Sequence, residues 1–193
     1  MVEAILKAAT ELVGEGGIHG LTTNHIARRA GVSVGSLYRY FPDKESIIAE
    51  LDLRYRRAAA DTMLLGIAKL SSEDVDLEAA LARILRHFMV PPHETLAVRR
   101  MFMRSVPLEW IERGAAEIWS SVVDPVTQAF RRLRPEVSEA ELRRRVIVAL
   151  HAVQGVALAS IVWEPEALPG SDAASELARM LAPYLLAPSA HCG

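Results

Sequence analysis

One stretch, residues 22–44 (TTNHIARRAGVSVGSLYRYFPDK), constrains the fold of this chain more than any other, because it contains two helical patterns separated by a glycine. Ile26 and Ala27 begin an apolar helical face, and Gly31 can adopt the left-handed backbone conformation that ends a helix. Ser33 can then cap a second helix. Two short helices joined by a turn of about three or four residues that contains glycine form a helix-turn-helix, whose second helix enters the major groove of DNA.

Duplex recognition needs two kinds of contact, and this stretch supplies residues for both. Phosphates are bound by hydroxyls, by cations and by the N–H groups at helix N-termini, which position a protein on DNA without reading its sequence. Base edges are read in the major groove, where Val34 can contact a thymine methyl and Gly35 lets the backbone come close. The residues predicted to bind phosphate are Thr22, Thr23, Tyr38, Tyr40 and Lys44. The residues predicted to lie at or beside the base edges are Asn24, Arg28, Ser33, Val34, Gly35, Ser36 and Arg39.

Some of these side chains have a purely structural alternative. Tyr38 could be a half-buried packing residue, and Arg28 or Arg29 could lie on a solvated helix face. The local charge favours DNA, because four of the five cations in residues 1–44 lie within 22–44 but only one of the four acids does. Since the whole chain has a net charge of −2, binding to nucleic acid must depend on such a local patch.

The pattern T-x-x-x-I-A-x-x-A-G-V-S-x-G-S-L-Y-x-Y-F-x-x-K, from Thr22 to Lys44, resembles the N-terminal signature of the tetracycline-repressor (TetR) family of transcriptional regulators. The likeness in sequence is confined to the N-terminal part, and the rest of the chain agrees in layout. The resemblance implies an all-α fold, with a three-helix helix-turn-helix domain in residues 1–45 and a helical ligand-binding and dimerisation domain in residues 46–193. It also implies a homodimer that binds a palindromic DNA operator and a small-molecule effector.

The rest of the sequence is helical in pattern, without a strand-length run of alternating β-branched residues. Asp43 is expected to cap a long helix, and the charged stretch 71–76 is expected to be a linker. A kink or break is expected at Asp124-Pro125. Besides the two helices of the motif, the predicted helices are 2–15, 44–70, 77–90, 94–105, 107–133, 138–163 and 172–186.

The family resemblance implies that helices of the second domain enclose the effector. Large apolar side chains with a few polar ones are the usual lining of such a cavity, although at helical spacing most residues of this kind are plain core. The predicted ligand-contacting residues are Met63, His87, Phe88, Met101, Phe102, Arg104, Trp110, Trp119 and His151.

The helix predicted at 138–163 is expected to form the dimer contact, again by resemblance. It carries several small residues, which allow a partner helix to approach closely. These small residues are Ala149, Ala152, Gly155 and Ala159.

Other classes of function are disfavoured by the sequence. The string GVSVG at 31–35 spells the nucleophile elbow of hydrolases, but that motif requires a preceding strand and here it follows a helix. The six histidines lack paired metal-ligand spacing, so no metal site is predicted. Residues 146–163 have the apolar composition of a membrane span, but His151 and Gln154 interrupt them. We therefore predict neither an enzyme, nor a cofactor, nor a membrane protein.

The cellular compartment is predicted from the single cysteine. Cys192 cannot form an internal disulfide, which indicates a reducing environment, and the first residues lack a signal-peptide pattern. Both features predict the cytoplasm.

The predicted function is a DNA-binding repressor that a small, largely apolar ligand releases from its operator. Two alternatives remain open: a helix-turn-helix protein that binds DNA constitutively, and a relative in fold that only binds small molecules. The intact stretch from Ser33 to Lys44 disfavours the second alternative. The sequence identifies neither the operator nor the ligand.

Overall fold

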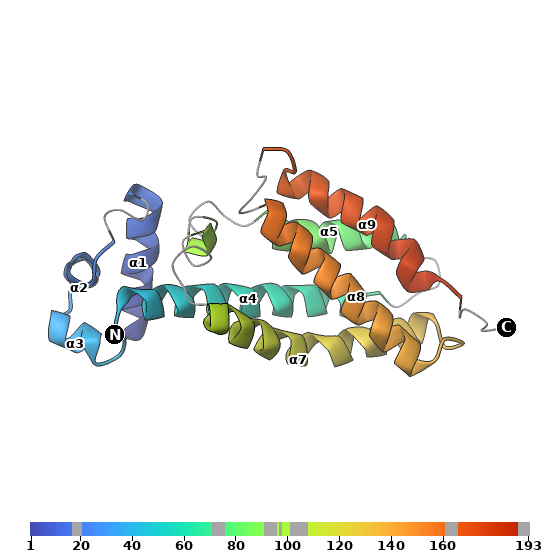
Figure 1. Ribbon diagram of the computed structural model, residues 1–193, viewed down its shortest axis with the longest axis horizontal. Coiled ribbons are helices and arrows are strands. Elements are labelled where there is room, and N and C mark those ends of the chain that lie inside the picture. Colours follow the sequence, from blue (N-terminus) through green and yellow to red (C-terminus); the bar gives the residue numbers. More distant parts are fainter. Residues whose placement is uncertain are drawn as a thin grey trace. The chain divides into compact units, whose positions relative to one another are not determined.

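The structure, a computed structural model, describes residues 1–16, 21–70, 76–90, 96, 98–100, 108–160 and 166–188 (Figure 1). For residues 16, 108–117 and 119 it describes the backbone alone. Every regular element in these ranges is a helix, which confirms the predicted all-α class. By its internal contacts the chain divides into two compact units, Met1–Arg57 with Pro91–Ala115 and Ala58–Val90 with Ala116–Gly193. The predicted domain boundary after residue 45 stays a prediction.

The first unit contains α1 (Val2–Gly16), α2 (Thr23–Ala30), α3 (Val34–Tyr38) and the first part of α4 (Lys44–Ala68). Because α3 has only five residues, its own hydrogen bonds cannot keep it helical, and it depends on packing. Leu37 provides that packing, since its side chain is completely buried. The fully buried side chains of this core are those of Ile5, Ala9, Ile26, Leu37, Ile47 and Ile48.

Ion pairs on the surface of the first unit connect its helices. The guanidinium of Arg29 on α2 donates hydrogen bonds of 2.9 and 2.7 Å to the carboxylate of Glu15 on α1. A longer bond of 3.4 Å joins the same guanidinium to Glu11. On α4, Arg54 pairs with Glu3 of α1 at 2.5 Å. These pairs hold α1 against its two neighbours.

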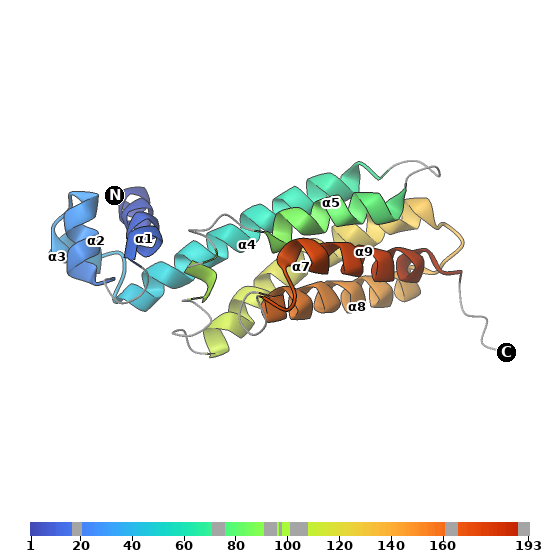
Figure 2. The same cartoon turned by 90° about the horizontal axis from the view of Figure 1, so that it is seen from above.

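The second unit contains the remainder of α4 with α5 (Leu77–Met89), the later part of α7 (Leu108–Leu133), α8 (Glu139–Leu158) and α9 (Gly170–Leu186). α9 packs against both α5 and α8 (Figure 2). Its buried face is rich in alanine, and such small side chains allow a close approach between helices. The most deeply buried residues of this core are Phe130, Leu142, Val146, Ala157, Ala173, Ala174 and Ala178.

Pro125 does not break α7. The helix runs without interruption from Leu108 to Leu133 with this proline inside it, so of the kink or break expected at Asp124-Pro125 the break is wrong, and the kink stays a prediction. A proline within a helix costs roughly 3 kcal/mol. Val122, Val126 and Phe130 on the same helix are buried, and each such side chain contributes about 1.5–3 kcal/mol. Burial of this face therefore outweighs the cost of the proline.

The remaining predicted helix limits agree with the structure to within a few residues wherever it describes them. The linker at 71–76, the helix at 94–105 and the end of the helix at 138–163 lie wholly or largely outside the described residues. None of the described helices combines the length and the apolar character that are needed to cross a membrane.

Two arginines hold the C-terminal end of α9. Arg134 donates a hydrogen bond to the carbonyl of Leu186, and Arg145 donates to the carbonyls of Ala187 and, at 2.9 Å, Pro188. The last carbonyls of a helix have no intrahelical donor and carry partial negative charge. The two guanidinium groups supply both the missing donors and a compensating charge.

The contact between Arg29 and Glu15 predicts a pH-dependent contribution to stability. Hydrogen bonding to Arg29 lowers the pKa of Glu15 below the usual 4.5 of a glutamate, so the folded state keeps this carboxylate charged to a lower pH than the unfolded chain does. The contact stabilises the fold above the unfolded pKa, and this stability is lost as the pH falls through the folded pKa. We expect Glu15→Gln to lower the urea midpoint at neutral pH and to match the wild type in acid.

A matched control for this measurement is Glu166→Gln, because Glu166 is exposed and forms no ion pair with any described residue. Its urea midpoint should follow that of the wild type at every pH. A difference between Glu15→Gln and the wild type that keeps the same size from neutral pH to strong acid would contradict the prediction.

Candidate nucleic-acid interface

Side-chain caps delimit the two short helices of the motif. The Thr22 hydroxyl accepts a hydrogen bond of 3.2 Å from the backbone N–H of His25, and the Ser33 hydroxyl accepts one of 3.0 Å from that of Ser36. Gly31 ends α2 with a φ of 68°, in the left-handed region that favours glycine. The predicted roles of Gly31 and Ser33 in shaping the helix-turn-helix are confirmed, and the structure shows that Thr22 caps α2.

Most of the residues predicted to contact DNA lie on the surface of α2, α3 and the turn between them. Tyr38 is 50% exposed and Tyr40 is 47% exposed, so both rings reach the surface although each is partly covered by the chain. Leu37 and Phe41 from the same stretch point into the core. Thr23, Ser36 and Lys44 are half-buried, and the exposed members are Thr22, Asn24, Arg28, Ser33, Val34, Gly35, Tyr38, Arg39 and Tyr40.

A hydrogen bond joins the start of α2 to the end of α3. The hydroxyl oxygens of Thr23 and Tyr38 are 3.1 Å apart. A hydroxyl donates one hydrogen bond and accepts up to two, so this pair keeps the capacity to bind a phosphate as well. The contact brings together two hydroxyls that the sequence assigns to phosphate binding.

Ser33 and Ser36 have different roles although both are serines of the turn and α3. The Ser33 hydroxyl donates to the Ser36 hydroxyl oxygen at 2.8 Å and also accepts from the Ser36 backbone. Ser33 has therefore used its hydrogen, whereas the hydrogen of the Ser36 hydroxyl can be donated to another molecule. Ser36 lies in the first turn of α3, the part of a recognition helix that contacts base edges.

The structure separates two neighbouring arginines. The guanidinium of Arg29 is hydrogen-bonded to Glu15, and these hydrogen bonds raise the pKa of Arg29. Arg29 therefore has a structural role, because it connects α2 to α1. Arg28 is exposed and forms no ion pair within the described part of the chain. Arg39 is also exposed, with its guanidinium 5.8 Å from the centre of the Tyr40 ring, within the range of a cation–π contact. The exposed guanidinium groups available to DNA are those of Arg28 and Arg39.

Lys44 lies at the first position of α4, next to a negatively charged cap. The Asp43 carboxylate accepts a hydrogen bond of 2.7 Å from the backbone N–H of Ser46, which confirms the predicted cap. Because this carboxylate caps the helix N-terminus, it offsets the attraction of the helix dipole for a phosphate, and the Lys44 ammonium supplies a positive charge beside it. That ammonium is 3.9 Å from Glu45, in a pair open to solvent.

The predicted ligand-contacting residues are only partly placed. Met63 and Phe88 are half-buried at the margin of the apolar core of the second unit. His87 on α5 and His151 on α8 are exposed, so both stand outside that core. Met101, Phe102 and Arg104 lie outside the described residues, and only the backbone of Trp110 and Trp119 is described.

A groove of about 590 Å³ lies in the second unit, between the last turns of α4 and the later part of α7. The residues along it include Leu64, Leu65, Pro125, Gln128 and Arg132. None of the predicted ligand-contacting residues whose side chains the structure describes lines this groove. Within the described side chains, the ligand contacts predicted from the sequence therefore do not indicate this groove.

Two family models match the chain. The model described as "Bacterial regulatory proteins, tetR family" matches residues 5–51, and the model described as "Tetracyclin repressor-like, C-terminal domain" matches residues 76–185. The first covers the candidate interface, and the second covers more than half of the chain.

Curated relatives match over about a quarter of the chain. The fatty acid metabolism regulator protein of Bacillus subtilis is 43% identical over 47 residues, which are 24% of this chain and 24% of that protein. The class C tetracycline repressor protein of Escherichia coli is 39% identical over 49 residues, which are 25% of this chain and 22% of that protein. The matched part thus spans about a quarter of the length of these relatives.

A solved structure agrees over the whole chain. The Thermus thermophilus transcriptional repressor FadR, in complex with lauroyl-CoA, shares 17% identity with a TM-score of 0.65, and the match covers 100% of this chain and 99% of that one. At this identity the likeness concerns the fold alone. Together with the two family models and the helix-turn-helix geometry, it leads to one conclusion: the chain belongs to the tetR family of bacterial regulatory proteins, which are DNA-binding regulators of transcription.

Proposed function

We propose that this chain is a repressor that binds a palindromic operator as a homodimer and leaves it when a small, largely apolar ligand binds. The observation that carries the proposal is the exposed face of α2 and α3, where hydroxyls and the guanidinium groups of Arg28 and Arg39 gather around the helix-turn-helix. In this proposal residues 1–45 read DNA, and residues 46–193 bind the ligand and the second subunit. Such a protein acts in the cytoplasm and is not an enzyme.

Gly35 supports a close approach of DNA to α3. A Cβ atom at Gly35 would meet no atom of the protein within 4 Å, so the packing of the chain does not require a glycine there. Alanine is also a better helix former than glycine, by about 1 kcal/mol. The space in front of Gly35 is therefore best explained by a partner outside the chain, which is DNA in this proposal.

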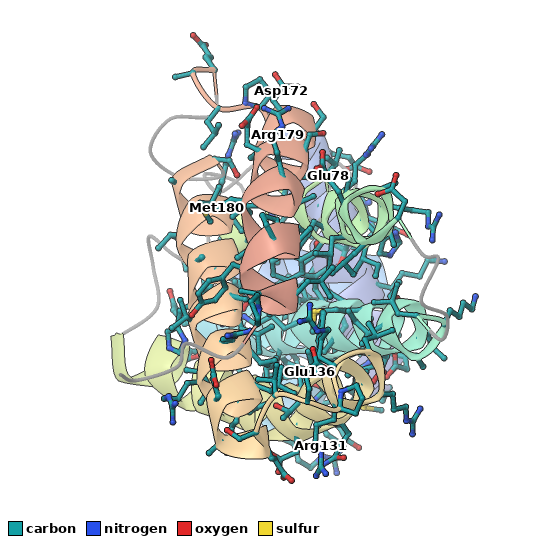
Figure 3. All side chains as sticks on the ribbon, turned by 90° about the vertical axis from the view of Figure 1, so that its right-hand side faces the viewer. Glu78, Arg131, Glu136, Asp172, Arg179 and Met180 are labelled. Carbon is teal, nitrogen blue, oxygen red and sulfur yellow. The ribbon has the colours of Figure 1, made fainter. Side chains whose placement is uncertain are left out.

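An exposed apolar surface on α8 and α9 supports dimerisation. Val148 on α8 is 53% exposed, and Met180 and Tyr184 on α9 are 54% and 37% exposed. Figure 3 shows Met180 on the outer side of α9. Because α8 and α9 are packed together and exposed apolar groups mark interaction surfaces, we propose that a second copy of the chain covers this surface.

The small residues of α8 divide between two surfaces. The sequence predicts that Ala149 faces a partner helix. Instead, Ala149 is buried in the core of its own unit. Gly155 is exposed, and a Cβ atom there would meet no atom within 4 Å. A partner helix can therefore approach α8 most closely at Gly155.

The chemistry of the ligand is proposed from the second unit and from the relatives. Met63, Leu64 and Phe88 are half-buried at the margin of an otherwise apolar core, where an apolar guest can contact them. The Thermus thermophilus relative was solved with lauroyl-CoA, and the Bacillus subtilis relative is named for fatty acid metabolism. A long-chain acyl group is therefore the first apolar guest to test, carried on coenzyme A as in the Thermus thermophilus relative.

The two alternatives differ from this proposal in one property each. A constitutive DNA-binding protein would bind its operator equally well with and without ligand. A relative that only binds small molecules would have no operator, which the exposed cations and hydroxyls of α2 and α3 disfavour.

The close-approach argument predicts opposite effects of two glycine substitutions. Gly35→Ala should leave the free energy of unfolding unchanged or raise it by up to about 1 kcal/mol, and should weaken operator binding at least severalfold. Gly31→Ala should lower the free energy of unfolding instead, because alanine is strained at a φ of 68°. Urea unfolding and fluorescence anisotropy with a selected duplex measure the two quantities. Operator affinity of Gly35→Ala equal to that of the wild type would remove DNA as the reason for this glycine.

The dimer surface is tested by Gly155→Leu. A Cβ atom at this position meets no atom of the single chain within 4 Å, so a loss of the dimer with unchanged helix content is attributed to the partner. We expect sedimentation to show a shift toward monomer, with unchanged helix content and weaker operator binding. Ala79→Leu, at an exposed position of α5, is the control and should sediment as the wild type does. A Gly155→Leu protein that is as dimeric as the wild type would place the interface elsewhere.

The repressor mechanism is tested by titrating lauroyl-CoA into the protein with and without a duplex that the protein selects from a random pool. Binding linkage is reciprocal, so the factor by which ligand weakens operator binding must equal the factor by which operator weakens ligand binding, commonly about 5- to 150-fold. Coenzyme A without an acyl chain should bind far more weakly, because it lacks the apolar part. Equal lauroyl-CoA affinities in the two titrations would instead favour a constitutive DNA-binding protein.

A further inference from the structure

A buried carboxylate lies in the first unit, away from the candidate DNA interface. Asp52 on α4 is only 2% exposed, the lowest value among the charged residues that the structure describes. The guanidinium Nε of Arg56, one turn further along α4, is 2.5 Å from its Oδ2 atom. The Nε of Arg99 is 3.7 Å from its Oδ1 atom, on the other side of the carboxylate.

Of the two arginines, Arg99 comes from a distant part of the chain. A buried charge is costly unless it has a partner, and removing one partner of a buried pair is strongly destabilising. Arg56 can satisfy the carboxylate from within α4 itself, so the fold of α4 does not depend on Arg99. The additional contact with Arg99 instead ties residues 98–100 to α4.

Two further contacts hold the same short segment. The guanidinium of Arg99 lies 5.0 Å from the centre of the Tyr55 ring, a cation–π distance. Burial raises the pKa of the Tyr55 hydroxyl, which stays neutral beside this cation at physiological pH. Val98 is 4% exposed and belongs to the apolar cluster that also contains Leu37 of α3. Residues 98 and 99 are thus fixed to the unit that carries the DNA-reading helices.

Residues 98–100 lie in sequence between α5 and the predicted ligand-contacting residues, which makes the contact of Arg99 with Asp52 relevant to regulation. The chain enters it from α5 of the second unit, and the predicted ligand-contacting residues Met101, Phe102 and Arg104 follow Arg99 directly in sequence. Because Met101, Phe102 and Arg104 follow Arg99 closely along the backbone, we take the backbone as the route by which a displacement of these residues is passed to Arg99. The distances within the first unit show where such a displacement would arrive, namely at Asp52 and at the apolar cluster behind α3.

We infer that Asp52 is a positioning residue for regulation, which acts through Arg99. By holding Arg99, it fastens residues 98–100 to the DNA-reading helices, so that ligand binding and DNA binding affect each other through this segment. The inference rests on the proposed function and adds to it the residues that connect the two activities.

The test follows the connection from the DNA side and uses the full-length chain. A duplex is selected from a random pool by the wild-type protein, and hydrogen exchange is measured by mass spectrometry for a peptide that covers residues 96–104, with and without this duplex. In the wild type the duplex should slow exchange in this peptide by about fivefold or more, as expected for coupled sites. In Arg99→Met the duplex should still bind, but the slowing should be lost.

Arg99→Met is the decisive variant because Asp52 keeps Arg56 as a partner. Asp52→Asn, which keeps the shape of the side chain and removes its charge, should lose the slowing to the same extent. Arg99→Lys keeps a cation near Asp52 and should retain part of it. The control is Arg54→Met, which removes a half-buried arginine of α4 from its pairs with Glu3 and Glu50. In this variant the duplex should slow exchange as much as it does in the wild type.

The outcomes distinguish this inference from the proposed function. If the wild-type protein selects no duplex, the proposed function fails and the inference fails with it. If the wild type binds DNA but Arg99→Met and Asp52→Asn transmit the slowing undiminished, the inference alone is wrong. It is also wrong if DNA leaves the exchange of residues 96–104 unchanged in the wild type. A coupling between lauroyl-CoA and the duplex that falls in Arg99→Met, with unchanged affinity for the duplex alone, would support it from the ligand side.

Discussion

The burial of Ile47 and Ile48 in the core that α4 shares with α1 and α3 is the interaction on which the rest of the structure depends. Both isoleucines are completely buried, in one cluster with Ile5 of α1 and Leu37 of α3. A helix of five residues cannot persist alone, so α3 has a defined orientation only because this cluster holds it. The two isoleucines lie on α4, the long helix that continues into the second unit, so this helix shares its core with the recognition helix.

Charge in the first unit is arranged so that neighbouring residues have different functions. Arg28 and Arg29 are adjacent and both exposed, but Arg29 is bound to Glu11 and Glu15, whereas Arg28 forms no ion pair with a described residue. The carboxylate of Asp52 differs from these exposed groups because it is buried, and a buried charge requires a partner, here a guanidinium group. Exposed ion pairs therefore hold α1 in place, exposed guanidinium groups are left for phosphate or bases, and one buried carboxylate connects α4 to a segment from later in the chain.

Glycine has three separate physical roles in this protein. Gly31 is required by the backbone, because only a residue without a side chain readily adopts its conformation. Gly66 is required by packing within the chain, since a Cβ atom there would lie 2.7 Å from Ile84. At Gly35 and Gly155 neither reason applies, and the open space in front of them points to partners outside the chain. These are a DNA duplex for Gly35 and a second subunit for Gly155 in the function that we propose.

Features that depend on a few consecutive residues could be predicted from the sequence alone. The caps at Thr22, Ser33 and Asp43 and the left-handed Gly31 are of this kind, because each is decided by groups within about four positions along the chain. The helical class and the family likewise follow from local periodicity and from the motif. The break expected at Pro125 was wrong because local backbone preference was outweighed by the burial of Val122, Val126 and Phe130.

Only the tertiary structure decided which of several equivalent residues has which partner. The sequence offers no reason why Arg29 is paired and Arg28 is not, why Ala149 faces the core and Gly155 the outside, or why Arg99 meets Asp52. Each of these outcomes depends on residues that are distant in sequence and close in space. A helical pattern fixes which side chains share a face, but the neighbour that covers that face is selected by packing of the whole unit.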